Sequence, residues 1–175
     1  MPIHHSPPIF KFHDDFNSTW RLTPESLGII NSIINSHPEF PFILKILIRN
    51  LGIPDLHIKT ENFGNCLNIK YGIGPIQKSQ TIHFRTIGWK GLYNTYNLMV
   101  QMEPGYSKKF RICGMIPGRG FSQFTYLLLD DGKFLNIDVS VPMTPDSVPF
   151  TCSLMFYSIQ RNHPLSRHSG LLASD

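Results

Sequence analysis

Apolar and polar residues alternate along several segments of the chain after residue 55. The alternation is regular in 56–60, 66–71 and 81–85. A period of two places the apolar side chains on one face of a β-strand and the polar side chains on the other. Weaker forms of the same pattern predict further strands over 96–102, 110–116, 124–129, 134–141 and 151–159. This part of the chain is therefore predicted to form a mainly antiparallel β-sheet.

A tight turn is predicted between two of these strands, at Asp130-Asp131-Gly132-Lys133. Aspartate tolerates, and glycine favours, the backbone conformations that a short hairpin turn requires. The strands over 124–129 and 134–141 are thus predicted to be neighbours in the sheet.

Helical spacing replaces the alternation near the N-terminus. Thr23-Pro24-Glu25 indicates a helix start, since it combines a hydroxyl N-cap, a proline at the first helical position and an acid near the positive end of the helix dipole. Apolar residues then recur up to Ile34, and His37-Pro38 is predicted to end the helix. A second short helix is predicted over 41–50. The predicted fold class is α+β, with a short N-terminal helical pair packed on a mainly antiparallel β-sheet body.

The chain divides into an arm, one domain and a tail. Residues 1–18 carry prolines and histidines without periodicity, which predicts a flexible arm, part of which lies along a sheet edge or in a neighbour's groove. Residues 19–160 are predicted to form a single α+β domain, because 175 residues suit one sizeable core. Residues 161–175, rich in Ser, His and Arg, are predicted to be a loosely attached tail.

The composition favours a folded protein that works through its surfaces. Hydrophobic residues make up 41% of the chain and charged residues only 16%, below the quarter or so that is usual. A sparsely charged surface favours cover by another copy, a membrane or a partner. No apolar run reaches the 18 or so residues that span a bilayer, and the N-terminus does not resemble a secretory signal. Membrane contact is therefore expected to be peripheral and from the cytoplasmic side.

Charge is distributed unevenly within the net value of +4. Residues 59–119 hold nine basic and two acidic side chains, a net charge of +7, whereas 120–150 carry a net charge of −3. The basic region is predicted to bind an anionic partner, either RNA or a lipid surface, although a solvated face or attraction between copies explains the same pattern. The predicted contacts are Lys70, Lys78, Arg85, Lys90, Lys108, Lys109, Arg111 and Arg119.

Catalytic and metal-binding patterns do not stand out. The eight histidines and three cysteines make none of the spacings that bind zinc, and the cysteines sit in apolar segments, which predicts reduced core thiols. The glycine-rich segments 72–75 and 114–120 lack the residues of a phosphate-binding loop. No enzyme activity, metal or cofactor is predicted. One arrangement stays open, a cluster of His83, Cys113 and Asp138, should the fold bring these side chains together.

Two apolar features predict self-association or membrane contact. Leu44 and Ile48 fall outside the buried stripe of the second predicted helix, so we expect them to form an exposed apolar patch. The arm supplies the other feature, with Pro7, Pro8, Ile9 and Phe10.

The order of these features resembles the matrix proteins of rhabdoviruses, in particular those that infect plants, such as cytorhabdoviruses. The resemblance is carried by the proline-bearing arm, the helix that leads into the apolar segment from Phe42, the basic glycine loop and the late Asp-Asp-Gly hairpin. It implies a non-enzymatic assembly protein that self-associates and links the ribonucleoprotein to the inner face of the membrane during budding. The implied partners are further copies, viral nucleoprotein or RNA, anionic membrane and the envelope protein tail. The implied locations are the virion, the host cytoplasm and the cytoplasmic face of membranes.

A second function fits the same basic region. A small RNA-binding protein, such as a viral suppressor of RNA silencing, would place residues 59–119 along the phosphates of a duplex.

Overall fold

A computed structural model describes residues 9–36, 52–73, 76–83, 88–90, 95–142 and 144–162. The strands are β1 (Phe10–Phe12), β2 (Ser18–Leu22), β3 (Leu56–Glu61), β4 (Cys66–Ile73), β5 (Ile76–His83), β6 (Gly88–Lys90), β7 (Thr95–Asn97), β8 (Met99–Met102), β9 (Gly105–Ser107), β10 (Lys109–Ile116), β11 (Gly120–Leu129), β12 (Phe134–Val141) and β13 (Phe150–Ser158). The helices are α1 (Pro24–Ser36) and α3 (Ile159–Asn162), with short 3-10 turns η1 (Asp14–Phe16), η2 (Asn62–Gly64) and η3 (Asp130–Gly132).

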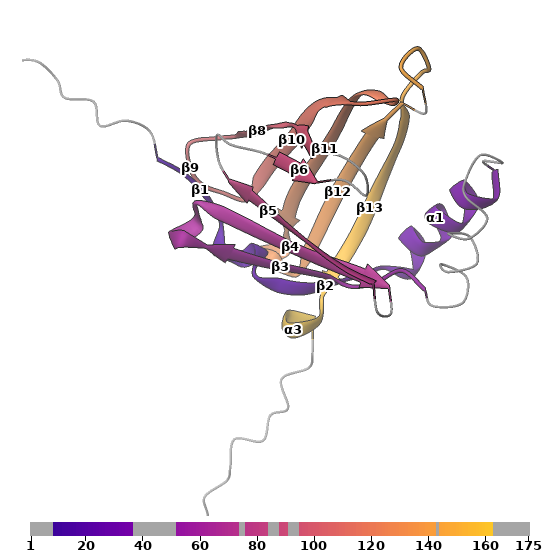
Figure 1. The fold of residues 1–175 in the computed structure, drawn as a ribbon. Coiled ribbons are helices and arrows are strands. Elements are labelled where there is room, and N and C mark those ends of the chain that lie inside the picture. Colours follow the sequence, from indigo (N-terminus) through magenta and orange to yellow (C-terminus); the bar gives the residue numbers. More distant parts are fainter. Residues whose placement is uncertain are drawn as a thin grey trace, which may run out of the picture.

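Nine strands form one continuous antiparallel sheet in the order β5-β4-β3-β2-β13-β12-β11-β10-β8. The sheet curls, so that β3, β4 and β5 cross in front of β10 to β13 and the two groups face each other across its concave side (Figure 1). Two small pairs are also present, the parallel pair β1–β9 and the antiparallel pair β6–β7.

The predicted α+β class is wrong, because the fold is a curled, mainly β half-barrel. The first helix begins at Pro24 as predicted, with the hydroxyl of Thr23 accepting a hydrogen bond from the backbone of Ser26. It contacts β13 near one end of the sheet and does not form a helical layer over it. A sheet that curls can bury one of its faces against itself, and it needs no helices for that purpose. The second predicted helix, over 41–50, lies outside the described residues.

Most of the predicted strands are present. The strands over 56–60, 66–71, 110–116, 134–141 and 151–159 match β3, β4, β10, β12 and β13 to within two residues at each end. The region 96–102 is split into β7 and β8, and β5 begins five residues before position 81. The hairpin turn at Asp130 is confirmed as η3, which joins β11 to β12.

Part of the predicted arm belongs to the core. Phe12 and Phe16 are fully buried, and each packs edge-on against Phe110, with ring centroids 5.0 and 5.2 Å away. Phe110 in turn stacks on Tyr126 at 4.6 Å. The chain before residue 18 therefore seals one end of the curled sheet with aromatic side chains. Residues 1–8 lie outside the described part of the chain.

None of the helices that the structure describes is long and apolar enough to cross a membrane.

Candidate functional site

Apolar side chains from all nine strands line the concave face of the sheet. Cross-strand partners in an antiparallel pair point to the same side, so the registers show which residues share this inner face. Its buried members come from all nine strands and from the residue before β8: Trp20, Ile58, Leu67, Ile69, Ile82, Leu98, Val100, Phe110, Ile112, Tyr126, Leu128, Leu135, Ile137 and Phe156.

Burial along this face differs between its two ends. At the end sealed by Phe12 and Phe16, neighbouring inner side chains such as Phe110 and Leu135 are 0–1% exposed. At the opposite end, which we call the open end, inner apolar side chains remain partly exposed. This end holds Leu22, Leu56, Tyr71, Ile116, Phe124, Val139 and Leu154. The register of Ile116 with Gly120 places Ile116 beside the β10–β11 turn, and Phe124 and Val139 lie on the turn side of the buried pair Tyr126 and Ile137, while α1 lies at the same end (Figure 1).

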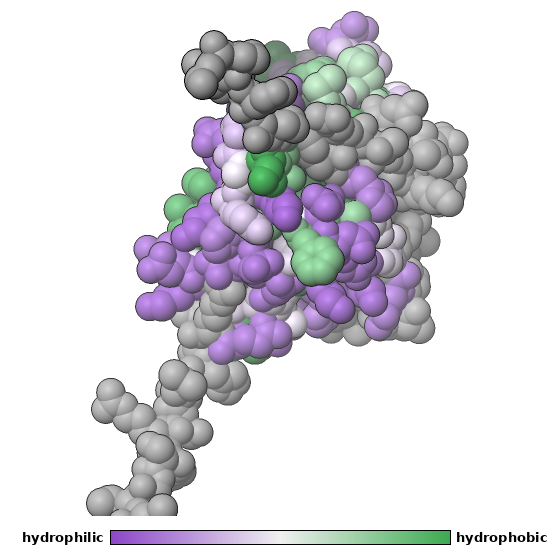
Figure 2. All heavy atoms as spheres, turned by 90° about the vertical axis from the view of Figure 1, so that its left-hand side faces the viewer, coloured by the Kyte–Doolittle hydropathy of each residue, from purple (hydrophilic) through white to green (hydrophobic). Residues whose placement is uncertain are grey.

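The outer surface that the structure describes is more polar, apart from the exposed Met99, Met115 and Phe121 on the neighbouring strands β8, β10 and β11. Figure 2 shows the side of the molecule that lies at the left of Figure 1, where most of the described surface is hydrophilic and apolar residues are isolated. Scattered apolar residues of this kind are normal on a protein surface. The inner face, in contrast, is continuous, and its open end holds seven incompletely buried apolar residues that pack against the core.

Besides the small side chains of Ser18, Thr60, Ser122 and Ser158, larger polar side chains interrupt the apolar inner face. Gln80 is the cross-strand partner of Ile69, and Tyr71 lies further along β4 on the same face. Tyr126 faces them from β11. Burial raises the pKa of Tyr126 strongly, with a further increase from the charge of an ionised Tyr71, and burial also raises the pKa of Tyr71. Both phenols therefore stay protonated and uncharged at neutral pH.

Cys152 also lies on the inner face near the open end, as the partner of Val139. Burial raises the pKa of its thiol, and the charge of nearby Asp138 raises it further. Cys152 is half-buried, whereas Cys66 and Cys113 are buried, and all three are free thiols.

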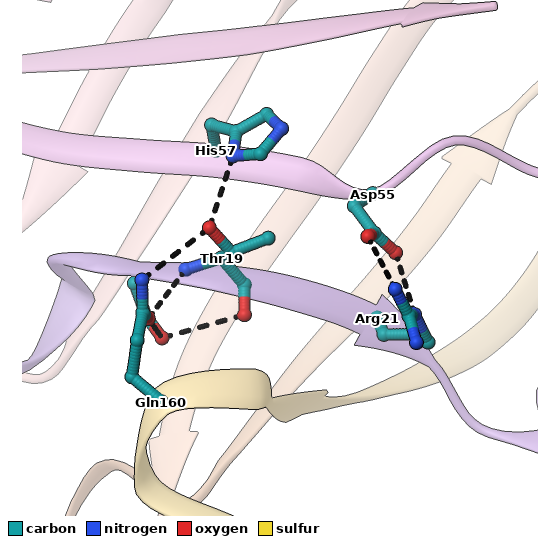
Figure 3. Close-up of polar contacts among 6 residues, drawn as sticks. Thr19, Arg21, Asp55, His57 and Gln160 are labelled. Atoms are coloured by element: carbon teal, nitrogen blue, oxygen red, sulfur yellow. Dashed lines mark hydrogen bonds and ion pairs between the residues drawn. The ribbon is translucent and has the colours of Figure 1, made fainter.

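A polar cluster on the outer side holds β2, β3 and α3 together (Figure 3). The Oε1 atom of Gln160 accepts a hydrogen bond from the backbone N–H of Thr19 at 2.8 Å, and the Thr19 hydroxyl lies 3.0 Å from Nδ1 of His57. Arg21 forms a two-bond ion pair with Asp55 at 2.9 and 3.0 Å, which raises the pKa of the guanidinium. These contacts fasten neighbouring elements to one another at the surface.

The side chains of Cys66 and His83 meet on the outer face of β4 and β5. The Cys66 sulfur lies 2.9 Å from Nδ1 of His83 and accepts a hydrogen bond from the Asn62 amide at 3.4 Å. His83 thus contacts Cys66 at one end of the sheet order, while Cys113 and Asp138 lie on β10 and β12 towards the other end. The open hypothesis of a cluster of His83, Cys113 and Asp138 is not supported. Among the described residues, no group of three or more His, Cys, Asp or Glu could hold a metal ion.

The predicted anion-binding residues are dispersed. Lys109 and Arg111 share the outer face of β10, as their alternation predicted, and Arg119 is exposed at the β10–β11 turn. Lys70 lies on the outer face of β4, and five strands separate β4 from β10 in the sheet order. The amine of Lys108 lies 3.6 Å from Asp131 and 4.0 Å from Asp15, so acidic groups partly offset its charge. The side chains of Lys78, Arg85 and Lys90 lie outside the described residues.

The structure describes only two of the residues that were predicted to take part in self-association, Ile9 and Phe10. Pro7, Pro8, Leu44 and Ile48 lie outside the described residues. Ile9 is 61% exposed, and Phe10 begins β1, which pairs with β9.

Comparison with solved structures identifies the fold. Lipid binding protein 8 of Caenorhabditis elegans matches with a TM-score of 0.56 and 16% identity, over 82% of this chain and 95% of that protein. Fatty-acid-binding protein 1 of Echinococcus granulosus matches with a TM-score of 0.55 and 13% identity, over 83% and 98%. The Schistosoma mansoni fatty acid binding protein, solved with arachidonic acid, matches with a TM-score of 0.54 and 12% identity, over 83% and 96%.

Sequence comparisons add no relative. No family model matches the chain, and no curated protein matches it. At 12–16% identity, the likeness to the three structures establishes a shared fold, that of the fatty-acid-binding proteins. All three are named as binding proteins. The shared fold is therefore consistent with the prediction of a non-enzymatic protein.

The resemblance to rhabdovirus matrix proteins is wrong. The similar structures are lipid-binding proteins, and nothing in them supports the implied assembly function, the RNA-binding alternative, or the partners predicted from either. The order of arm, helix, basic loop and hairpin misled because such features recur in unrelated folds. The residues of the concave face could be predicted from the sequence, since they are the apolar positions of each alternating strand. The sequence pattern could not predict that these positions face one common interior.

Proposed function

We propose that this protein binds an apolar small molecule, one with a long hydrocarbon part, on the concave face of its sheet, and that it does so without catalysis. The observation that carries the proposal is the open end. There, inner residues of β2, β3, β4, β10, β11, β12 and β13 are apolar yet only partly buried.

A hydrocarbon chain that covered these residues would remove apolar surface from water on both molecules. Each square ångström of apolar surface so buried contributes about 25 cal/mol to the free energy of binding. The shared fold with a protein solved around arachidonic acid supports the same class of ligand.

The experiment compares two phenylalanines on one strand. Phe124 lies on the inner face at the open end, whereas Phe121 lies on the outer face and is 56% exposed. Purified, delipidated protein is titrated with a fluorescent fatty acid, which is then displaced by an unlabelled long-chain lipid. We expect Phe124→Ala to weaken binding by roughly tenfold, equivalent to about 1.4 kcal/mol.

Phe121→Ala is the matched control and is expected to bind as the wild type does. Melting temperatures of both variants establish that they are folded. If the wild type binds no long-chain probe, or if both variants bind equally well, the concave face is not the binding site.

A further inference from the structure

Gln80 carries a buried polar atom without a partner. Its amide Nε2 is inaccessible to water and makes no hydrogen bond. The register pairs Gln80 with Ile69, which belongs to the buried core, and the next inner residue on β5 is the fully buried Ile82. The amide is therefore held among apolar side chains on the concave side. An unpaired buried amide destabilises a fold, so its presence calls for a partner that the free protein lacks.

Tyr126 faces the same interior from the opposite wall. Its side chain is nine-tenths buried, and its ring is fixed against Phe110 by stacking at 4.6 Å. No hydrogen bond to the Tyr126 hydroxyl is present among the described residues. Tyr71 influences the titration of Tyr126 electrostatically, which places the two phenols within reach of each other's charge. The register thus places the Gln80 amide and the Tyr71 hydroxyl near each other on the inner face of β5 and β4, and Tyr126 lies on the inner face of β11.

These groups are all uncharged. Among the inner positions whose side chains the structure describes, none carries a charge, and both phenols remain protonated at neutral pH because burial raises their pKa. A buried carboxylate requires a cation or several charge-stabilising donors, whereas a hydroxyl or a neutral amide requires only hydrogen-bond partners. The groups that the structure describes therefore suit a neutral polar headgroup; Lys78, the register partner of Tyr71, is a cation whose side chain lies outside the described residues.

The position of the group fits such a ligand. Tyr126 is the next inner residue on β11 after Phe124 and lies deeper than the partly exposed row of Phe124, Val139 and Leu154. Tyr71 belongs to the open end, so a headgroup held between Tyr126 and Tyr71 would lie at the inner edge of that row, with the hydrocarbon chain along Phe124, Val139 and Leu154.

We infer that Tyr71, Gln80 and Tyr126 form a headgroup subsite for an uncharged, hydrogen-bonding group, such as the hydroxyl of a long-chain alcohol or the amide of a long-chain primary amide. The inference rests on the proposed function, because it assigns the headgroup of a ligand whose chain occupies the concave face.

The experiment measures the affinities of three ligands of one chain length, the primary alcohol, the primary amide and the carboxylate, by displacement of a fluorescent lipid at neutral pH. We expect the wild type to bind the alcohol and the amide at least fivefold more tightly than the carboxylate. Tyr126→Phe and Gln80→Leu are each expected to lower the affinity for the alcohol and the amide at least fivefold. Both variants are expected to bind the fluorescent lipid as tightly as the wild type does, because its hydrocarbon chain contacts the open end and not the headgroup subsite.

Two matched controls change the same residue types on the surface. Tyr106 is 59% exposed, and Gln77 lies on the outer face of β5, so Tyr106→Phe and Gln77→Leu are expected to leave all three affinities unchanged. A second readout is the melting temperature of the ligand-free protein. It should rise in Gln80→Leu, which removes the unpaired amide, and should not rise in Gln77→Leu.

The outcomes separate the two claims. A wild type that binds no long-chain molecule overturns the proposed function and this inference with it. A wild type that binds the fluorescent lipid but prefers the carboxylate overturns the headgroup inference alone, as does an unchanged affinity for the alcohol in Tyr126→Phe and Gln80→Leu. Lys78 is the register partner of Tyr71, and its side chain lies outside the described residues. A preference for the carboxylate that disappears in Lys78→Gln would assign the headgroup to that lysine instead.

Discussion

The burial of Tyr126 on the concave face makes the stability of the protein depend on pH. It is stacked on Phe110 and almost completely buried, and its pKa in the folded protein is raised above the value of 10.0 that it has in water. The unfolded chain exposes the phenol, which then ionises at its ordinary pKa. Above about pH 10, the unfolded state therefore releases this proton while the folded state retains it.

The sign of the effect follows from this difference. The stabilising contribution of the protonated phenol is fully present below pH 10 and is lost as the pH rises further, by up to about 1.4 kcal/mol for each pH unit. We expect the free energy of unfolding to fall more steeply between about pH 9 and pH 11 in the wild type than in Tyr126→Phe. Urea unfolding at several pH values measures both slopes. Equal slopes would mean that Tyr126 ionises as readily in the folded protein as in the unfolded chain.

At the scale of elements, the η2 turn connects β3 and β4 through three residues with positive φ, as the η3 turn does between β11 and β12. Gly64 ends the positive-φ run of η2 with φ +83°, and a Cβ atom there would lie 2.9 Å from the carbonyl oxygen of Phe12. That oxygen belongs to the N-terminal segment. The segment can therefore pack this closely against the η2 turn only if residue 64 has no side chain.

Replacing Gly64 by alanine tests this requirement. Gly118 is a matched control, since it has a similar φ of +75° but no atom within 4 Å of a Cβ. Gly118→Ala is expected to cost about 1 kcal/mol of stability from backbone strain alone. Gly64→Ala carries the same strain and a steric clash, so we expect it to cost at least 1 kcal/mol more in chemical denaturation. Equal losses of stability in the two variants would show that the N-terminal segment moves away from the added methyl group without a loss of stability.

At the scale of the whole molecule, the N-terminal segment closes one end of the curled sheet. Phe12 and Phe16 precede the first strand of the main sheet, yet both are fully buried against Phe110. Truncating a buried phenylalanine to alanine costs about 3–5 kcal/mol, and a domain has a total stability of about 5–15 kcal/mol.

The double variant Phe12→Ala/Phe16→Ala is therefore expected to lose most of its stability and to unfold near room temperature. Phe63, which is 90% exposed, supplies the control, because Phe63→Ala removes the same side chain without opening the core. Circular dichroism with heating measures both. A double variant that melts within a few degrees of the wild type would mean that the segment is the detachable arm that its composition suggests.

The local structure of this protein is largely determined by local sequence. Alternation predicted most strands of the sheet, Asp130-Asp131-Gly132 predicted its hairpin turn, and Thr23-Pro24 predicted the first helix, because each depends on residues close together in the chain. Tyr71 lies within the alternation over 66–71, whereas Gln80 precedes the strand that was predicted over 81–85.

The tertiary structure decided the rest. Whether alternating strands stay flat beneath helices or curl into a half-barrel depends on the twist summed over nine strands and on which edges meet, and no single segment carries that information. For the same reason the basic residues of 59–119, close in sequence, are spread over distant strands, while Tyr71, Gln80 and Tyr126 are brought to one interior from β4, β5 and β11. The sequence alone determined which side chains each strand presents to its apolar face, and the curl of the sheet determined that those faces enclose a common interior.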